Sequence, residues 1–165
     1  MQLQTSLPLA KAAEIVDEAL RLGRAEGLLP LTVVALDSGG KLIAMKSEDG
    51  SGLMRFDIAF AKAWGALGMG ISSRLIRDRL ANRPTFQNAL AAASDGRLVP
   101  VPGGVLVRDG DEITIGAIGI SGDTSDKDEY CAILAIRRAG MASEPHEPDP
   151  GWRSSSLADT YPGST

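Results

Sequence analysis

The sequence predicts an α+β fold in which helices pack around a single antiparallel sheet. Two pairs of apolar, β-branched segments are each joined by a short glycine-containing turn, which is the pattern of a β-hairpin. Segments with helical periodicity lie before, between and after these pairs, and nothing indicates parallel βαβ units. With 165 residues, 44% of them hydrophobic, the chain is large enough for one domain with its own core.

The first part of the chain predicts a helix, a hairpin and a second helix. Apolar residues recur at helical spacing over 8–26, and Gly27 follows as a stop signal. Two strands, "LTVVALD" at 31–37 and "KLIAMKS" at 41–47, flank the turn "SGG". After a polar loop, the alanine-rich segment 55–70 has the apolar spacing of a helix.

Two short helices, a second hairpin and a last helix are predicted downstream. The first short helix has to end before Pro84, because proline clashes with a helical residue ahead of it. Ser125 and Asp128 have the spacing of a capping box, which marks the start of the last helix. The predicted elements are helices over 73–82 and 84–94, strands over 104–109 and 113–121, and a helix over 125–139.

Residues 141–165 differ in character from the domain that we predict over 1–140. The segment contains four prolines and lacks apolar periodicity, so we expect an irregular C-terminal tail. Trp152 is a large apolar anchor within it. Two interpretations stay open: a loose end, or a tail that docks Trp152 on its own body or on a neighbouring subunit.

Charge and cysteine content narrow the class of protein. A net charge of −4 and a pI near 5.0 do not favour nucleic acid or an anionic membrane as a partner. The single Cys131 excludes an internal disulfide framework and a cysteine-based zinc site, and no metal site is predicted. The first residues lack the pattern of a signal peptide, and no run approaches the ~18 apolar residues of a membrane span. We therefore expect a cytoplasmic protein.

The glycine-rich segment "GGVLVRDGDEITIGAIGISGD" (103–123) does not have the spacing of a P-loop or of a dinucleotide-binding loop. Carboxylates at the start of the following helix would also repel a phosphate. Within a strand, Gly116 and Gly119 face opposite sides and leave room for a close neighbour. That neighbour is either the alanine-rich helix 55–70 or a flat ligand, and packing of the helix is the simpler interpretation.

A few side chains could carry chemistry. Lys62 lies in the apolar run "IAFAKAWGA", where a lysine either extends to water or points into a cleft. Cys131 is interpreted as a buried structural thiol rather than a nucleophile. The only histidine, His146, lies in the tail, which argues against a Ser-His-Asp triad. Asp128 and Glu129 are better explained as helix-cap residues than as a general acid and base.

Residues 74–83 carry four arginines and one aspartate, a net charge of +3. Arg74 and Asp78 stand four positions apart on a predicted helix, a spacing at which the two side chains can pair. The segment is either a solvated face or a seat for the carboxylates of a ligand or of an acidic partner, for which Arg74 and Arg83 are the candidates.

Three stretches together resemble the GlcG/HbpS family of heme-binding-like proteins: "VVALDSGGKLIAMKSEDG", "DIAFAKAWGALGMG" and "PGGVLVRDGDEITIGAIGISGDTSDKDEYCA". They are also similar to the C-terminal domain of PduO-type cobalamin adenosyltransferases. The likeness covers roughly residues 5–139, and the combination of motifs is specific although each motif alone is weak. The motif positions of the family fall on Asp37, Gly39, Gly40, Lys62, Gly103, Gly104, Gly119, Ser121, Gly122 and Asp128.

The resemblance implies a profilin-like arrangement of about five antiparallel strands, homo-oligomers, and a small-molecule ligand for which heme is the named candidate. Heme iron usually takes His, Cys, Met or Tyr as its axial ligand. The predicted domain has no histidine, and its other residues of these types stand in no recognisable ligand context, so no axial ligand is assigned. The candidate ligand-binding residues are Lys62, Arg74, Arg83, Gly103, Gly104, Gly119 and Ser121.

Three functional hypotheses follow. The first is an oligomeric small-molecule-binding protein linked to a catabolic pathway, with its ligand in a groove beside the glycine strand and Lys62. The second is an enzyme acting on a small carboxylated or carbonyl metabolite, in which Lys62 serves as base or electrophile and Asp128 transfers protons. The third is a purely structural oligomer.

Overall fold

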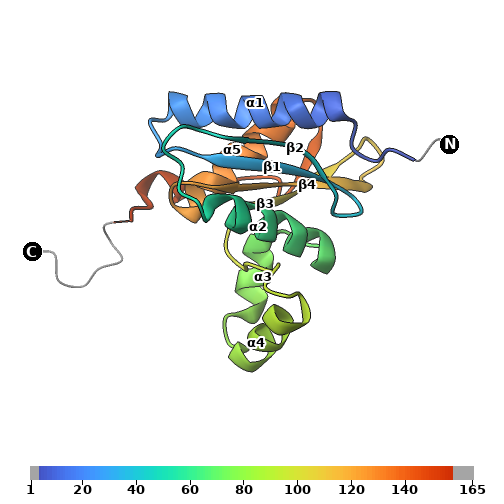
Figure 1. Ribbon diagram of the computed structural model, residues 1–165, viewed down its shortest axis with the longest axis vertical. Helices are drawn as coiled ribbons and strands as arrows, with labels where there is room; N and C mark the ends of the chain where they lie inside the picture. Colours follow the sequence, from blue (N-terminus) through green and yellow to red (C-terminus); the bar gives the residue numbers. More distant parts are fainter. Residues whose placement is uncertain (1–3, 158–165) are drawn as a thin grey trace, which may run out of the picture.

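The computed structural model describes residues 4–157, which form one antiparallel sheet with helices packed around it, as the sequence predicts (Figure 1). The five strands lie in the order β2-β1-β4-β3-β5. They are β1 (Thr32–Asp37), β2 (Leu42–Ser47), β3 (Gly104–Arg108), β4 (Thr114–Ser121) and β5 (Ala142–Glu144). The helices are α1 (Leu9–Ala25), α2 (Arg55–Met69), α3 (Ser73–Leu80), α4 (Pro84–Ala93) and α5 (Ser125–Arg138), with a short 3₁₀ turn η1 (Trp152–Ser154).

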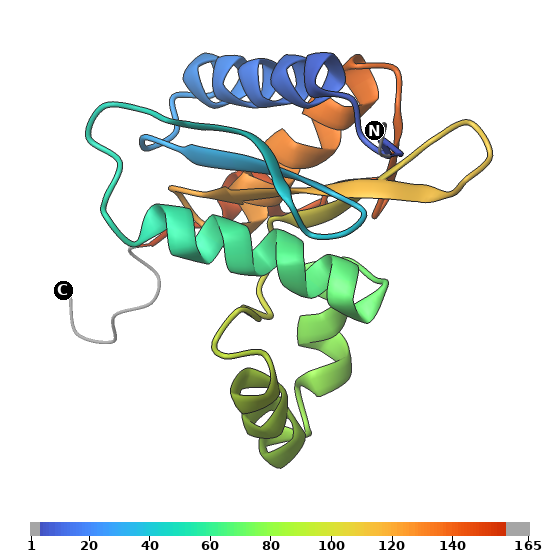
Figure 2. The same cartoon turned by 45° about the vertical axis from the view of Figure 1, so that its right-hand side comes forward.

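The helices cover the two faces of the sheet differently. In both ribbon views, α1 and α5 lie over one face, and α2 crosses the other (Figures 1 and 2). Helices α3 and α4 extend beyond α2, away from the sheet. One apolar core fills the space between α1, α5 and the sheet, and a smaller core lies between α2 and the sheet. None of the helices within residues 4–157 is long and apolar enough to cross a membrane.

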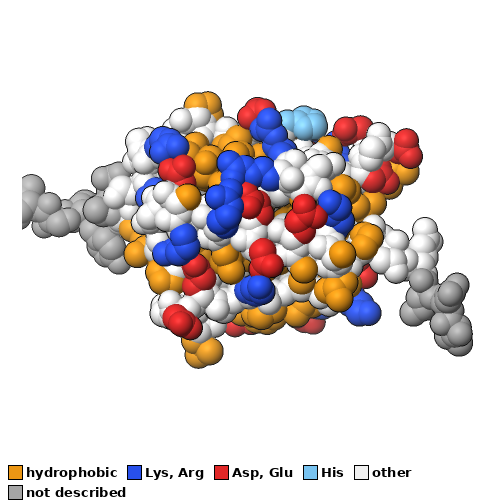
Figure 3. All heavy atoms as spheres, turned by 90° about the horizontal axis from the view of Figure 1, so that it is seen from above, with side chains coloured by type: hydrophobic (Ala, Val, Ile, Leu, Met, Phe, Trp, Pro, Cys, Tyr) orange, Lys and Arg blue, Asp and Glu red, His pale blue; other side chains and the backbone are white. Residues whose placement is uncertain are grey.

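The surface on the α1 side mixes both signs of charge (Figure 3). Lys11 and Glu14 pair at 2.8 Å, and Glu18 accepts from both Arg21 and Arg138 at 2.7 Å. Exposed pairs of this kind contribute little to stability. This face therefore presents neighbouring opposite charges rather than a field of one sign.

The segment that we expected to be irregular contributes a strand. Residues 142–144 form β5 and pair with β3, with Leu106 opposite Glu144. Trp152 stacks on Tyr130 of α5, with ring centroids 3.7 Å apart and planes 14° from parallel. Three residues are too few to show a β alternation in sequence, which is why the pattern did not reveal this strand. Of the two interpretations of Trp152, docking on its own body is the one observed; residues 158–165 lie outside the described residues.

The glycines of β4 are explained by close packing on both of its faces. A Cβ at Gly119 would overlap the carbonyl of Ala59 in α2, whereas a Cβ at Gly116 would overlap the carbonyl of Leu36 and press on Leu7. The two glycines therefore face opposite sides, as predicted. Helix α2 fills the space beside Gly119, which confirms the simpler of the two interpretations of this strand.

Replacement of Gly119 by alanine is expected to destabilise the protein by about 3 kcal/mol or more, because a backbone carbonyl cannot move aside as a side chain can. Gly110, which has no neighbour within 4 Å of a built Cβ, is the matched control. Urea unfolding of Gly119→Ala and Gly110→Ala measures the difference. Equal stability of the two variants would contradict the packing of α2 on β4.

Candidate functional site

Lys62 lies inside the protein between α2 and the start of α5. Its side chain is buried, and Nζ donates to the carbonyl oxygen of Ile120 at 2.9 Å and to Oδ2 of Asp128 at 3.0 Å. The lysine therefore does not extend to water. It forms a buried ion pair that links α2 to α5 across the end of β4.

Asp128 holds the start of α5 in a way that differs from the predicted capping box. Thr124 is the N-cap residue, and Ser125 is the first helical residue rather than the cap. The Asp128 carboxylate reaches back from the first turn and accepts the backbone N–H of Asp123 at 3.1 Å. Burial raises the pKa of Asp128 above its ordinary value, and the neighbouring Lys62 offsets only part of that rise.

Gly103 and Gly104 make the space that Lys62 occupies. A Cβ at Gly104 would overlap the backbone carbonyl of Lys62, and one at Gly103 would lie 2.9 Å from its Nζ. Gly103 also has a φ of +116°, a conformation that side chains disfavour. The hydroxyl of Ser73 in α3 bonds to the N–H of Gly104 at 2.8 Å. These residues thus pack around the lysine, and α2 occupies the place of the predicted groove.

Glu129, next to Asp128, is fully buried and faces α3. Its Oε2 lies 3.4 Å from Nε of Arg74, yet neither of its carboxylate oxygens accepts a hydrogen bond within the described chain. Burial raises the pKa of Glu129 to about 7, Arg74 opposes this rise, and Asp126 adds to it. Both carboxylates were expected to be helix caps, and Glu129 does not act as one.

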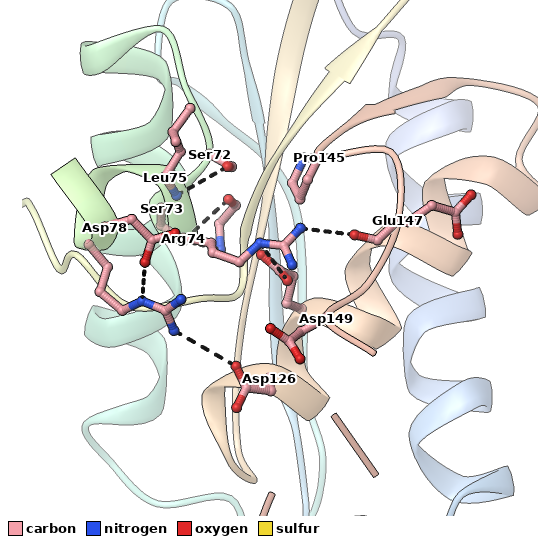
Figure 4. Close-up of polar contacts among 12 residues, drawn as sticks. Ser72, Ser73, Arg74, Leu75, Asp78, Asp126, Pro145, Glu147 and Asp149 are labelled. Carbon is pink, nitrogen blue, oxygen red and sulfur yellow. Dashed lines mark hydrogen bonds and ion pairs between the residues drawn. The ribbon is translucent and has the colours of Figure 1, made fainter. Parts of the chain in front are cut away.

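Arg74 turns toward α5 and the C-terminal segment, as Figure 4 shows. Its Nη2 donates to the carbonyl oxygen of Glu147 at 2.9 Å. The pairing with Asp78 that the spacing allows is not formed, since Asp78 instead accepts from Arg77 at 2.8 Å. Arg74 is instead directed inward at the buried carboxyl group of Glu129, 3.4 Å from its Nε.

The other candidate residues either lie away from Lys62 and Arg74 or contact neighbouring side chains of the chain itself. Arg83 is exposed and stacks over the ring of Phe86, with 4.5 Å between its Cζ and the ring centroid. Ser121 is buried, and its hydroxyl accepts from Arg55 at 3.2 Å. Cys131 is buried, as predicted, and burial raises the pKa of its thiol.

An apolar groove between α2 and α4 is a second feature, which we name the α2–α4 groove. It holds about 170 Å³ and is lined by Trp64, Gly65, Gly68, Met69, Leu90, Ala93, Ser94 and Leu98. The guanidinium of Arg97 lies over the Trp64 ring at 4.6 Å from its centroid. Sequence reasoning missed this groove. The available signal was the pair of small residues, Gly65 and Gly68, beside Trp64 on α2.

Replacement of Lys62 by methionine is expected to destabilise the fold by about 3–5 kcal/mol, because it leaves the buried Asp128 carboxylate without its partner. The double variant Lys62→Met/Asp128→Asn should recover part of the loss, since asparagine is neutral and still accepts from Asp123. Lys46→Met, which breaks an exposed pair with Asp17, is the control and should cost less than about 1 kcal/mol. Urea unfolding measures all three, and a Lys62→Met protein as stable as the control would refute the assignment.

Glu129 is expected to make stability fall as pH rises. The pKa is about 7 in the folded protein and 4.5 in the unfolded reference, so the penalty for ionising Glu129 grows between these values and is absent at lower pH. The free energy of unfolding falls by about 3 kcal/mol over this pH range. Glu129→Gln should remove this part of the pH dependence, whereas Glu147→Gln at an exposed position should keep it. Unfolding free energies at pH 5 and pH 8 provide the test, which fails if Glu129→Gln leaves the slope unchanged.

Solved structures share this fold. A complex of PduOC with heme superposes with a TM-score of 0.75 at 23% identity, covering 84% of this chain and 98% of that one. A double mutant of HbpS from Streptomyces reticuli gives 0.70 at 22% identity, covering 84% and 90%. The Klebsiella pneumoniae protein ORFY gives 0.72 at 26% identity, covering 85% and 94%. A search of curated proteins gave no match.

The family described as "Haem degrading protein HbpS-like" matches residues 7–137, from two residues before α1 to the last turn of α5. The matched residues include Lys62, Arg74, Asp128 and Glu129. Because it spans most of the chain, the protein belongs to the HbpS-like family.

Proposed function

We propose that the protein binds a small planar apolar ligand of the heme type, and that the α2–α4 groove is where it binds. The observation that carries this proposal is the indole of Trp64, which lines an open apolar groove beside the small residues Gly65 and Gly68. A flat ring system can stack on an indole, and neighbouring glycines let it approach the helix backbone. The family and the heme complex of PduOC support heme as the ligand class.

The residues of the groove fit part of a heme. Met69 lines the groove and is of a type that ligates heme iron, and Arg97 over Trp64 suits a propionate at the edge of the ring. A volume of about 170 Å³ is below the ~300 Å³ at which ligand pockets usually begin. The groove would therefore cover only part of a porphyrin. Bound heme would supply iron chemistry, whereas the contribution of the chain is to hold and orient the ring.

A second copy of the chain would cover the rest, in keeping with the homo-oligomer that the resemblance implies. Exposed apolar residues on the two helices that form the groove support this part of the proposal. Met69, which lines the groove, is 37% exposed, and Phe86 in α4 is 39% exposed. Exposed apolar residues grouped in this way are typical of protein interfaces. A place in a catabolic pathway in the cytoplasm completes the proposal.

Titration with hemin tests the ligand. The wild-type protein should show a Soret shift that saturates at a defined stoichiometry. Trp64→Ala should weaken binding about 10-fold or more, which corresponds to the ~1.4 kcal/mol expected of an aromatic stack. Trp152→Ala, which removes the other tryptophan, is the matched control and should bind as the wild type does. Absence of a saturable shift would exclude heme, and equal losses in both variants would exclude the α2–α4 groove.

A further inference from the structure

Three loops meet at the end of the sheet that lies next to the start of α2. They are the α1–β1 loop, the β2–α2 loop and the β4–α5 loop, and they enclose a hollow of about 220 Å³. We name it the Arg55 hollow; its lining includes Leu29, Pro30, Ser51, Gly52, Arg55 and Gly122. Trp64 and Met69 lie toward the other end of α2, and Met69 is about 20 Å from Arg55 along the axis at 1.5 Å per residue. The hollow is thus distinct from the α2–α4 groove.

Arg55 is a half-buried cation with no carboxylate partner. Its Nη1 donates to Oγ of Ser121 at 3.2 Å, and within residues 4–157 no carboxylate oxygen lies within 4.0 Å of its guanidinium. An arginine carries five N–H donors and stays charged at any physiological pH. Most of the donors of Arg55 are therefore available to a ligand at the hollow.

The acidic groups nearby are already neutralised by other partners. Glu48 pairs with Arg24 at 2.8 Å and accepts the N–H of Leu31. Asp123 pairs with Lys127 at 3.2 Å and accepts the N–H of Leu29.

Asp128 pairs with Lys62, and Arg55 stabilises the ionised form of Asp128 only from a distance. Asp57, in the first turn of α2, is exposed. None of these four carboxylates compensates the charge of Arg55 at short range.

Glycines keep the hollow open and add backbone donors. Among the described residues, no acceptor takes the N–H of Gly52 or of Gly122. A Cβ built on Gly52 would lie 3.9 Å from Cγ of Arg55, so a larger side chain there would enter the space beside the arginine. The free N–H groups at the start of α2 carry a partial positive charge, which adds to the positive charge of Arg55.

We propose that the Arg55 hollow binds a small oxyanion, either a carboxylate or a phosphate group. The hollow is lined by an arginine without a carboxylate partner and by two glycines whose N–H groups have no acceptor among the described residues, and such donors recognise oxyanions. A volume of about 220 Å³ suits the charged end of a small metabolite, and the lining of the hollow includes no aromatic ring on which a heme would stack. The proposal does not depend on heme binding at the other end of α2.

Calorimetric titration of the full chain with inorganic phosphate and with acetate, at constant ionic strength, tests the site. At least one of the two should bind saturably at one per chain, and the one that binds identifies the class of oxyanion. Arg55→Met should weaken binding 10-fold or more, and Arg55→Lys should retain part of it. Arg79→Met, which removes an exposed arginine of α3 that lines neither pocket, should bind as the wild type does.

Gly52→Leu provides a second test that leaves the bond between Arg55 and Ser121 in place. It should abolish binding by filling the hollow, and it decides the matter if Arg55→Met does not fold. Lack of saturable binding of both anions to the wild type would overturn the proposal. So would wild-type affinity in Arg55→Met or, if that variant is unfolded, in Gly52→Leu. None of these outcomes bears on the hemin titration, so the two proposals fail separately.

Discussion

The arrangement of charged groups in this protein depends on how closely the backbone of α2 approaches the middle of the sheet. Gly104 and Gly119 have no side chain where α2 passes, and the carbonyls of Lys62 and Ala59 lie in the vacant positions. At this separation, the Lys62 side chain cannot leave along the surface of the sheet. It runs through the space beside Gly103 to Asp128 instead. Side chains at the two glycines would displace α2 and separate the ion pair.

The start of α5 connects this interface to the rest of the molecule. Consecutive residues face different helices there, with Asp128 directed at α2 and Glu129 at α3. Asp128 has a full set of partners, whereas Glu129 has a cation at 3.4 Å and no hydrogen bond. A buried carboxylate in the second situation resists ionisation, which explains why the pKa of Glu129 lies near neutrality. The two neighbours therefore respond differently to pH although both are buried.

Much of the fold could be predicted because it depends on local patterns. The two hairpins follow from β-branched segments around glycine turns, and the close contact of α2 with the sheet follows from glycines in β4 facing alanines in α2. The contacts of the site were harder to predict from the sequence, because they join residues that are far apart in the chain. Lys62 and Asp128 could each be recognised as unusual, but neither pattern reveals that they meet. For Arg74, the sequence shows Asp78 as a nearby partner, whereas the carboxyl group beside it in the structure is the buried Glu129, which is distant in the chain.

The short strand β5 bears on how the sheet ends. β3 is buried along nearly its whole length, and its sequence "GVLVR" is apolar and β-branched. Without β5, the outer edge of β3 would present unpaired N–H and C=O groups beside apolar side chains, which is the kind of edge that recruits strands from other molecules. β5 occupies that edge, and the adjacent Pro145 cannot extend the ladder. The opposite edge is β2, which is largely exposed and carries Lys46. The C-terminal segment thus covers the edge of an apolar strand that would otherwise be open to pairing with another chain.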